Sequence, residues 1–221
     1  WIDILKGNSL IQKFTRFEFN LPLYILYSSG TTGKPKCIVH GAGGSLIQHK
    51  KEHQLHCNIQ PNDKVFYFTT CGWMMWNWLI SCLATKATIF LYDGSPFFPN
   101  KESMFDIIEK ENITFFGTGS KYLDTLKQNN LKIHRKYKLK HLKTIASTGS
   151  PLVHETFKYI YKSIKNNVHL TSISGGTDIV SCFVLGNPNM KVYAGEIQCK
   201  GLGMDVTIFD DDGKEINQRK G

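Results

Sequence analysis

Closely spaced cysteines are missing from this sequence. Its six cysteines are scattered between Cys37 and Cys199 without a C-x-x-C pair, which argues against both a disulfide framework and a structural zinc site and favours a reducing compartment. The sequence also lacks the stretch of about 18 uncharged apolar residues that a membrane-spanning helix needs, and its first residues have no signal-peptide pattern. We therefore expect a soluble, cytoplasmic protein with no membrane span.

Arginine is scarce, because only three of the 27 basic residues are Arg although the formal net charge is +9. The densest basic stretch, 121–143, holds eight Lys or Arg residues and one acid, Asp124. It lacks the arginines and interleaved aromatic side chains that stack on bases or read them. We interpret it as a solvated surface and expect no nucleic-acid partner. A polyanion-binding surface is the alternative, and some of this charge could attract a phosphorylated cofactor.

The chain begins with Trp1 rather than Met and ends on "DDDGKEINQRKG", a turn followed by charged residues. We interpret it as a piece of a longer protein, with oligomeric state not predicted by the sequence. At 221 residues the piece is long enough to bury a full core.

Apolar runs typical of buried strands alternate with helical stretches along most of the chain. The expected strands are residues 23–27, 64–70, 87–93, 113–118, 142–148 and 168–174. One expected helix has Asn100 as its cap candidate, another begins at Pro151, and a third, mostly apolar, covers 73–85. This alternation predicts an α/β fold with largely parallel sheets and helices on both faces.

The pattern changes after about residue 185. Glycine punctuation, alternating apolar residues and the turn at Asp210 to Gly213 favour antiparallel hairpins there, and we interpret the "DDDG" stretch as a hairpin turn rather than a calcium loop. We predict that residues 1–185 form the central α/β part of one domain and that 186–221 begin a β-rich subdomain.

Four loops rich in glycine and hydroxyl side chains each follow a predicted strand. They are residues 28–36, 69–73, 147–151 and 172–178. Ligands of open parallel sheets bind outside the carboxyl ends of the strands, so we expect these four loops to meet at one edge and form a ligand site. The first, "SSGTTGKPK", is not a P-loop because Pro35 follows Lys34, and we interpret it as a flap that wraps a polyphosphate.

Three histidines, His49, His53 and His56, fall at helical spacing and could in principle bind a metal. Because they lie beside Lys50 and Lys51, we predict instead that they form a solvated helical face. His40 receives no role from the sequence.

The stretch "YSSGTTGKPK" resembles the signature loop of the adenylate-forming superfamily, which contains acyl-CoA synthetases, luciferases and peptide-synthetase adenylation domains. Longer blocks resemble the acetoacetate-activating ligases of that superfamily, namely "KCIVHGAGGSLIQHKKEH", "GWMMWNWLISCLA", "LYDGSPFFP", "SISGGTDIVSCFVLGNP" and "GEIQCKGLGM". The resemblance extends from about Leu23 to the last residue. It implies an acid–thiol ligase: acetoacetate attacks the α-phosphorus of ATP to give an acyl-adenylate and pyrophosphate, and CoA then displaces AMP.

The resemblance also implies roles for particular residues. Those that would hold the β- and γ-phosphates are Ser28, Ser29, Gly30, Thr31, Thr32, Gly33 and Lys36. Those that would lie along the adenine are Gly149, Ser150 and Pro151. Gly176 and Thr177 would bind ATP, Thr177 touching the α-phosphate, and Asp178 would bind Mg²⁺ or orient phosphate; Thr177, Asp178 and Lys36 would be catalytic. Many relatives have Glu at the positions of Ser150 and Asp178, and a shorter carboxylate can still ligate Mg²⁺, directly or through water.

An acyl pocket is also implied, lined by Trp73, Met74, Met75, Thr148 and Gly175. Acetate-activating relatives have Trp where Gly175 falls, so we expect the glycine to deepen the pocket for a four-carbon oxo acid. No donor for the 3-oxo group is identified, and a ligase for another short or branched acid is the alternative, as is a non-catalytic nucleotide- or polyanion-binding fragment. The superfamily's ribose-binding Asp and its C-terminal lid domain with a catalytic Lys are not among these residues, so we expect the piece alone to be inactive.

Overall fold

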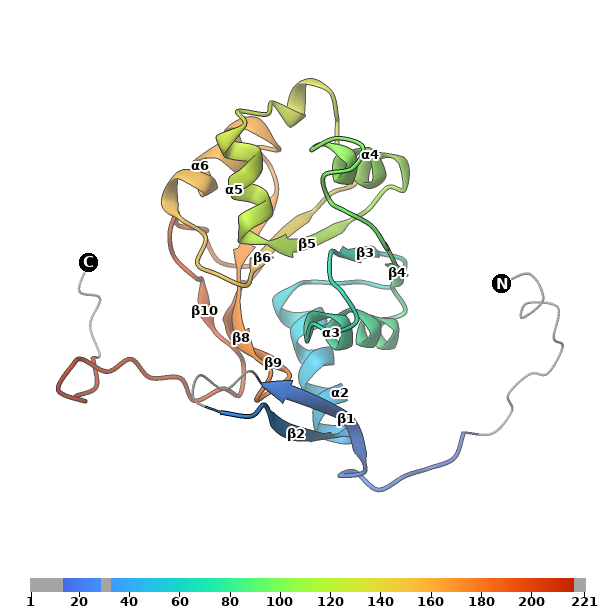
Figure 1. The fold of residues 1–221 in the computed structure, drawn as a ribbon, viewed down its shortest axis with the longest axis vertical. Coiled ribbons are helices and arrows are strands. Elements are labelled where there is room, and N and C mark those ends of the chain that lie inside the picture. Colours follow the sequence, from blue (N-terminus) through green and yellow to red (C-terminus); the bar gives the residue numbers. More distant parts are fainter. Residues whose placement is uncertain (1–13, 29–32, 217–221) are drawn as a thin grey trace, which may run out of the picture.

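The computed structural model describes residues 14–28 and 33–216 of the chain. Its central element is a five-stranded sheet in which all neighbouring strands are parallel, in the order β4-β3-β5-β6-β7 (Figure 1). The strands are β3 (Lys64–Tyr67), β4 (Thr88–Phe90), β5 (Phe115–Gly119), β6 (Thr144–Thr148) and β7 (His169–Ser172). This sheet confirms the predicted parallel α/β fold.

Helical segments cover both faces of this sheet. On one side lie α4 (Ser103–Lys110), α5 (Ser120–Gln128), the 3₁₀ turn η3 (Ile133–Arg135) and α6 (His154–Ser163). On the other lie α2 (Ala42–Lys51), the π-helical turn η1 (Glu52–His56), α3 (Met75–Ser81) and the 3₁₀ turn η2 (Cys82–Thr85). Among the described residues, no helix has both the length and the apolar character needed to cross a bilayer.

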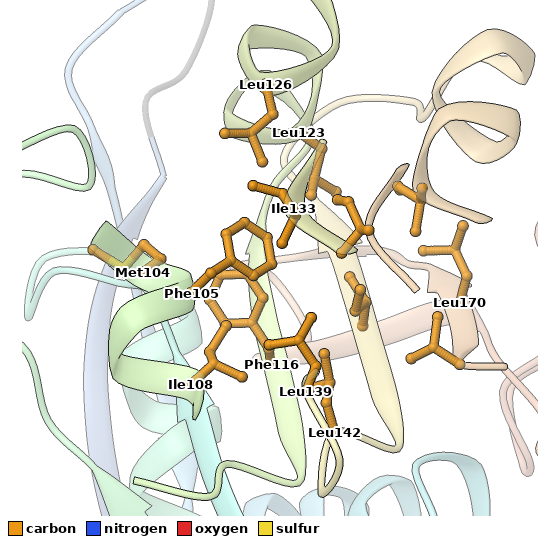
Figure 2. Close-up of a cluster of buried hydrophobic side chains, with 14 of the residues drawn as sticks. Met104, Phe105, Ile108, Phe116, Leu123, Leu126, Ile133, Leu139, Leu142 and Leu170 are labelled. Atoms are coloured by element: carbon orange, nitrogen blue, oxygen red, sulfur yellow. The ribbon is translucent and has the colours of Figure 1, made fainter. Parts of the chain in front are cut away.

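The strand register explains why there are two cores. Phe66, Phe116, Ile145 and Leu170 lie in one row across four strands and face α4, α5 and α6; Figure 2 shows Phe116 beside Phe105 of α4. Because successive side chains of a strand point to opposite faces, the neighbouring row belongs to the second core, around the fully buried Trp78. The sheet therefore has no solvated face over these rows.

The first predicted strand was wrongly placed in the parallel sheet. It is β1 (Pro22–Ser28), which pairs antiparallel with β2 (Lys36–Gly41) in a separate two-stranded sheet (Figure 1). It is also not buried, since Leu23, Ile25 and Tyr27 are exposed. The short connection between the two strands explains the pairing, because a parallel pair needs a crossover of a dozen or more residues. The first loop therefore does not follow a strand of the five-stranded sheet.

A small antiparallel sheet follows β7. Its strands are β8 (Ser174–Gly176), β9 (Ser181–Leu185) and β10 (Cys199–Lys200), in the order β10-β9-β8. Since β10 pairs with β9, this sheet includes residues on both sides of residue 186, and the domain boundary there stays a prediction. The turn at Asp210 to Gly213 is confirmed by an antiparallel bridge between Phe209 and Glu215.

The prediction that three histidines form a solvated face is wrong. His49, His53 and His56 are all buried, whereas Leu46 and Leu55 of the same helical segment are exposed. The reason lies in partners distant in sequence: His49 hydrogen-bonds Ser81 and Val180, and His56 hydrogen-bonds Gly186. The polarity of the neighbouring residues predicted the wrong face, because it carries no information about hydrogen-bond partners that are distant in sequence.

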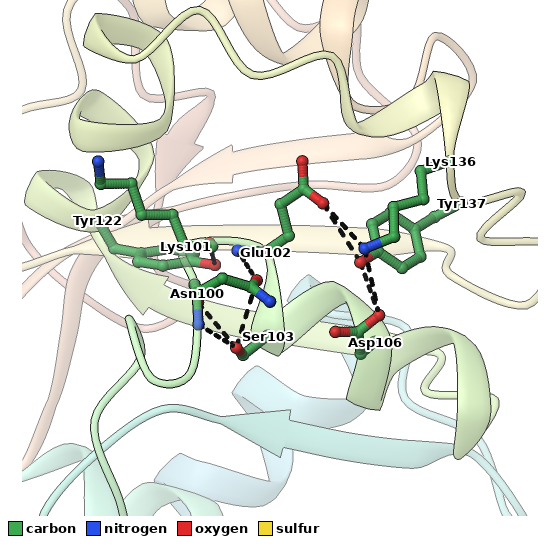
Figure 3. Close-up of polar contacts among 8 residues, drawn as sticks. All are labelled: Asn100, Lys101, Glu102, Ser103, Asp106, Tyr122, Lys136 and Tyr137. Atoms are coloured by element: carbon green, nitrogen blue, oxygen red, sulfur yellow. Dashed lines mark hydrogen bonds and ion pairs between the residues drawn. The ribbon is translucent and has the colours of Figure 1, made fainter.

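Two helices begin two or three residues later than predicted. α4 begins at Ser103 rather than next to Asn100, whose side-chain oxygen accepts a hydrogen bond from the Glu102 amide in the preceding turn (Figure 3). α6 begins at His154 rather than at Pro151. In both places the residues before the helix form a loop.

Candidate active site

A cavity of about 480 Å³ lies at the carboxyl ends of β6 and β7, a volume typical of small-molecule sites. It is lined by Trp73, Met74, Met75, Thr148, Gly149, Ser150, Pro151, Leu152, Ser172, Ile173, Ser174, Gly175, Gly176, Thr177, Cys182, Gly195 and Ile197. All five residues of the predicted acyl pocket, all three predicted adenine residues, and Gly176 and Thr177 are in this set. Segments between Trp73 and Ile197 that are separate in sequence thus meet around one space.

One wall comes from the turn between β3 and α3. Trp73 is half-buried and Met74 and Met75 are buried, and all three face the cavity. The rest of this tryptophan-rich helix belongs to the core, where Trp78 is fully buried. As expected from the sequence, only the first residues of the stretch are placed to contact a ligand.

A second wall is the loop after β6. Gly149 has φ of +89°, a conformation that L-residues with a side chain rarely adopt, and an added Cβ there would lie 3.9 Å from the Trp73 ring. Thr148 donates a hydrogen bond from its hydroxyl to the Ile173 carbonyl oxygen at 2.9 Å, and the Ser150 and Ser120 hydroxyls are hydrogen-bonded to each other. These bonds tie the loop to its neighbours.

Gly175 lines the cavity, but the structure gives a different reason for its lack of a side chain. An added Cβ would overlap the Ser181 carbonyl oxygen and lie 2.9 Å from the Cα of Cys182, both in the neighbouring strand β9. The glycine therefore permits the close approach of β8 to β9 at a register shift between Ser174 and Gly175. The expectation that it deepens the acyl pocket is wrong for this backbone, because the missing side chain would point at β9 rather than into the cavity.

The next residues, Thr177 and Asp178, lie in the turn between β8 and β9. The Thr177 carbonyl oxygen lies 2.9 Å from Nε2 of His40 in β2, so the separate hairpin is tied to this turn. Asp178 does not line the cavity but stands next to it, exposed, and within 14–28 and 33–216 its carboxylate has no hydrogen-bond or ion-pair partner. A hard cation could therefore reach it.

The residues present fit a Mg²⁺ ion that is held together with nucleotide phosphates, and not one held by protein side chains alone. The described part of the chain contains no group of three or more His, Cys, Asp or Glu side chains that could hold a metal. Mg²⁺ commonly binds through one or two carboxylates together with waters and substrate phosphates. The lone, unpartnered Asp178 suits that arrangement and not an all-protein metal site.

The predicted phosphate loop is only partly described. Ser29, Gly30, Thr31 and Thr32 lie outside the described residues. Ser28 and Lys36 are paired across the hairpin from β1 and β2, and Lys36 and Gly33 are exposed. None of these three lines the cavity, and a phosphate-binding role for the loop stays a prediction.

Sequence reasoning missed part of the lining, namely Leu152, Cys182, Gly195 and Ile197, which lie outside the four predicted loops. Burial raises the pKa of the Cys182 thiol well above its ordinary value, so this thiol is not expected to ionise and act as a nucleophile. A mostly apolar second cavity of about 430 Å³ also went unpredicted; Trp73 lines both cavities, which places the second beside the first.

Three of the seven lysines in the basic stretch 121–143 form ion pairs with acidic residues. Lys127 pairs with Asp124 at 3.3 Å and Lys143 with Asp63 at 2.8 Å. Lys136 lies 3.1 Å from Glu102 and 3.9 Å from Asp106 (Figure 3). These partners favour the interpretation as ordinary surface over a polyanion-binding surface.

Comparison with known proteins shows to which family the chain is similar. A model of the family described as AMP-binding enzyme matches residues 14–221. The chain is 55% identical over 208 residues to an acetoacetyl-coenzyme A synthetase of Rhizobium meliloti (strain 1021), covering 94% of this chain and 32% of that protein. It is 45% identical over 219 residues to the malonamoyl-CoA synthetase vrtB of Penicillium aethiopicum, covering 93% and 30%.

Among solved structures, the fold is similar to that of an acetoacetyl-CoA synthetase from Streptomyces lividans. The TM-score is 0.89 at 39% sequence identity, over 97% of this chain and 34% of that one. The chain thus spans about a third of the length of the relatives it matches.

Proposed function

The chain belongs to the AMP-binding enzyme family, and from this premise we propose that the protein containing it is an ATP-dependent acid–thiol ligase acting on acetoacetate. In the first step a carboxylate oxygen of acetoacetate attacks the α-phosphorus of ATP, and the bond to the β-phosphate breaks to release pyrophosphate. In the second the thiol of CoA, having lost its proton, attacks the acyl carbon and releases AMP. This proposal rests on similarity to relatives named for that activity.

The observation that carries the proposal is that one cavity has both an apolar wall and a polar wall. The Trp73 to Met75 wall offers large apolar and polarisable side chains for a short acyl chain. The Gly149 to Pro151 loop and the Gly176–Thr177 turn offer backbone groups and hydroxyls for a nucleotide. An acid and the α-phosphate could therefore meet in one enclosed space, where positioning supplies much of the rate.

Within this proposal, the chain's own residues hold the reactants and stabilise charge. Thr177 donates its hydroxyl to the α-phosphate, whose charge grows as the carboxylate adds. Lys36 and the hydroxyls of the loop that begins at Ser28 bind the pyrophosphate that leaves. Asp178 holds Mg²⁺, which when bound neutralises phosphate charge. The second cavity, which shares Trp73 with the first, offers CoA a path to the acyl carbon.

A second candidate is the same chemistry with a different short acid. It is favoured by the 45% identity to a malonamoyl-CoA synthetase. The described lining gives no donor that singles out a 3-oxo group, and one methylene in an apolar pocket changes transition-state binding by only about 1–3 kcal/mol. The acid must therefore be identified by experiment.

The test is ATP–pyrophosphate exchange by the complete gene product with a panel of short acids. We expect exchange with acetoacetate to exceed that with acetate, butyrate and malonamate by about tenfold or more in kcat/KM. A preference for malonamate or another acid would replace acetoacetate by the second candidate. Absence of acid-dependent exchange, together with salt-sensitive binding to polyanions and no preference for ATP, would overturn the ligase proposal.

A further inference from the structure

The turn that carries Thr177 and Asp178 contains a backbone conformation that needs support. Val180 has φ of +48°, a left-handed conformation that is unusual and strained for a β-branched residue. It is also buried, with its side chain in the second core. Such a conformation persists only where the surroundings hold it in place, so the contacts on the far side of this turn are of interest.

The support comes from the segment of residues 40–52, at the end of β2 and along α2. Its contacts reach the backbone of the turn and of the first residues of β9. His40 bonds the Thr177 carbonyl oxygen at 2.9 Å. His49 donates from Nε2 to the Val180 carbonyl oxygen, and its Nδ1 lies 2.8 Å from the hydroxyl oxygen of Ser81. Neither His40 nor His49 lines the cavity.

Glu52 is the centre of this support. It is completely buried, and its Oε1 accepts hydrogen bonds from the Ser181 hydroxyl, from the Cys182 amide at 3.1 Å and from Gln48 at 3.0 Å. Its Oε2 accepts one from the Trp78 indole at 2.9 Å. Gln48 also donates to the Ser181 hydroxyl oxygen at 2.7 Å. All four neighbours of the carboxylate are donors, and none is a Lys or Arg.

A carboxylate buried without a cation is costly unless it is fully hydrogen-bonded. Apolar residues would fill the same space without that cost, so packing alone does not explain Glu52. A carboxylate can only accept hydrogen bonds, and Glu52 accepts them from two consecutive residues, Ser181 and Cys182, that directly follow the strained Val180. The contacts fix where β9 starts and, with it, where the preceding turn lies.

We propose that Glu52 is a positioning residue for the adenylation step, acting through Ser181, Cys182 and the strained Val180 to hold Thr177 and Asp178 at the cavity. His40 and His49 hold the same turn at two further carbonyl oxygens. This inference rests on the proposed function, because the turn matters for catalysis only if the cavity binds ATP and an acid.

The test is the variant Glu52→Gln in the complete gene product, assayed by acetoacetate-dependent ATP–pyrophosphate exchange. The side-chain NH₂ of the new Gln faces either the indole N–H of Trp78 or the donors of Ser181 and Cys182. In either orientation two donors meet, so one contact becomes repulsive. Because small misplacement of reacting groups is costly, we expect kcat to fall about tenfold or more with the KM for ATP changed less than about threefold. Ser181→Ala, which removes the hydroxyl's hydrogen bonds to Glu52 and from Gln48 but adds no conflict, should lower kcat less.

A rescue distinguishes positioning from general damage. In Glu52→Gln with Trp78→Phe, the amide nitrogen faces a ring with no donor, and the amide oxygen can again accept from Ser181 and Cys182. We expect kcat of this double variant to return to within about threefold of Trp78→Phe alone. The matched control is His53→Leu, equally buried on the same helical turn and without a contact to residues 177–182; it should keep the wild-type kcat.

The outcomes separate the two proposals. If the wild-type protein shows no acid-dependent exchange, the proposed function fails whatever Glu52 does. If wild type is active and Glu52→Gln and Ser181→Ala keep its kcat, or the double variant shows no rescue, the role of Glu52 is refuted and the function stands. Should Glu52→Gln fail to fold, the decision falls to Ser181→Ala: lower kcat at unchanged melting temperature supports the role, and unchanged kcat refutes it.

Discussion

At the scale of single residues, two adjacent glycines have different physical reasons to be glycine. Gly175 cannot carry a Cβ because the backbone of β9 occupies that space. An added Cβ at Gly176 would instead meet the Phe183 ring at 3.7 Å and an Asp178 oxygen at 3.8 Å, which are ordinary contacts. The sequence shows only a Gly-Gly pair, so this distinction required the structure.

The pair gives a matched test. We expect Gly175→Ala to lower the free energy of unfolding by about 1–3 kcal/mol, because one strand must shift to admit the methyl group. Gly176→Ala should change that free energy by no more than about 0.5 kcal/mol, the range typical of substitutions without a packing conflict. Urea unfolding of both variants measures this, and equal losses at the two positions would contradict the assigned role of Gly175.

At the scale of elements, the segment formed by α2 and η1 shows where sequence reasoning failed. The lysines beside its three histidines predicted that the histidines form a solvated helical face. The helix does exist, but its buried face is the polar one, since Ser81, Val180 and Gly186 supply the hydrogen-bond partners. By contrast, the strands β3, β5, β6 and β7 were predictable, because long apolar runs in parallel sheets leave little ambiguity.

This buried face predicts a pH dependence of stability. His53 is buried with both ring nitrogens unpartnered and its ring edge-on to Trp78, and burial lowers its pKa from 6.5 to about 3. The unfolded chain therefore binds a proton that the folded protein excludes, so this contribution to stability is complete above pH 6.5 and is lost as the pH falls towards 3. Between pH 7 and pH 5 the free energy of unfolding should drop by about 2 kcal/mol from His53.

The measurement is urea unfolding at pH 7 and pH 5 of the wild-type protein and of His53→Leu. The variant should lose about 2 kcal/mol less than wild type over that interval. Equal pH dependence of the two proteins would show that His53 titrates normally in the fold. His49 acts in the same direction, since burial also lowers its pKa, so wild-type loss can exceed the share of His53.

At the scale of the whole molecule, the sequence predicted which loops lie together better than it predicted how the strands are arranged in sheets. Three of the four Gly- and hydroxyl-rich loops do follow strands of the parallel sheet, and two of them complete one cavity with the Trp73 turn. The fourth belongs to the β1–β2 hairpin, whose second strand, Lys36–Gly41, was not predicted. Its attachment to the site through His40 and Thr177 depends on tertiary contacts that no motif encodes.

The central claim is that this cavity holds an acyl group and an adenine nucleotide together. The most direct measurement is a crystal structure of the complete gene product with acetoacetyl-sulfamoyladenosine, a stable mimic of the acyl-adenylate. The account predicts the acyl chain against Trp73, Met74 and Met75, the adenine along Gly149 to Pro151, and the sulfamoyl group within hydrogen-bond distance of Thr177. A ligand bound outside this cavity, or bound with the adenine against Trp73 to Met75, would contradict it.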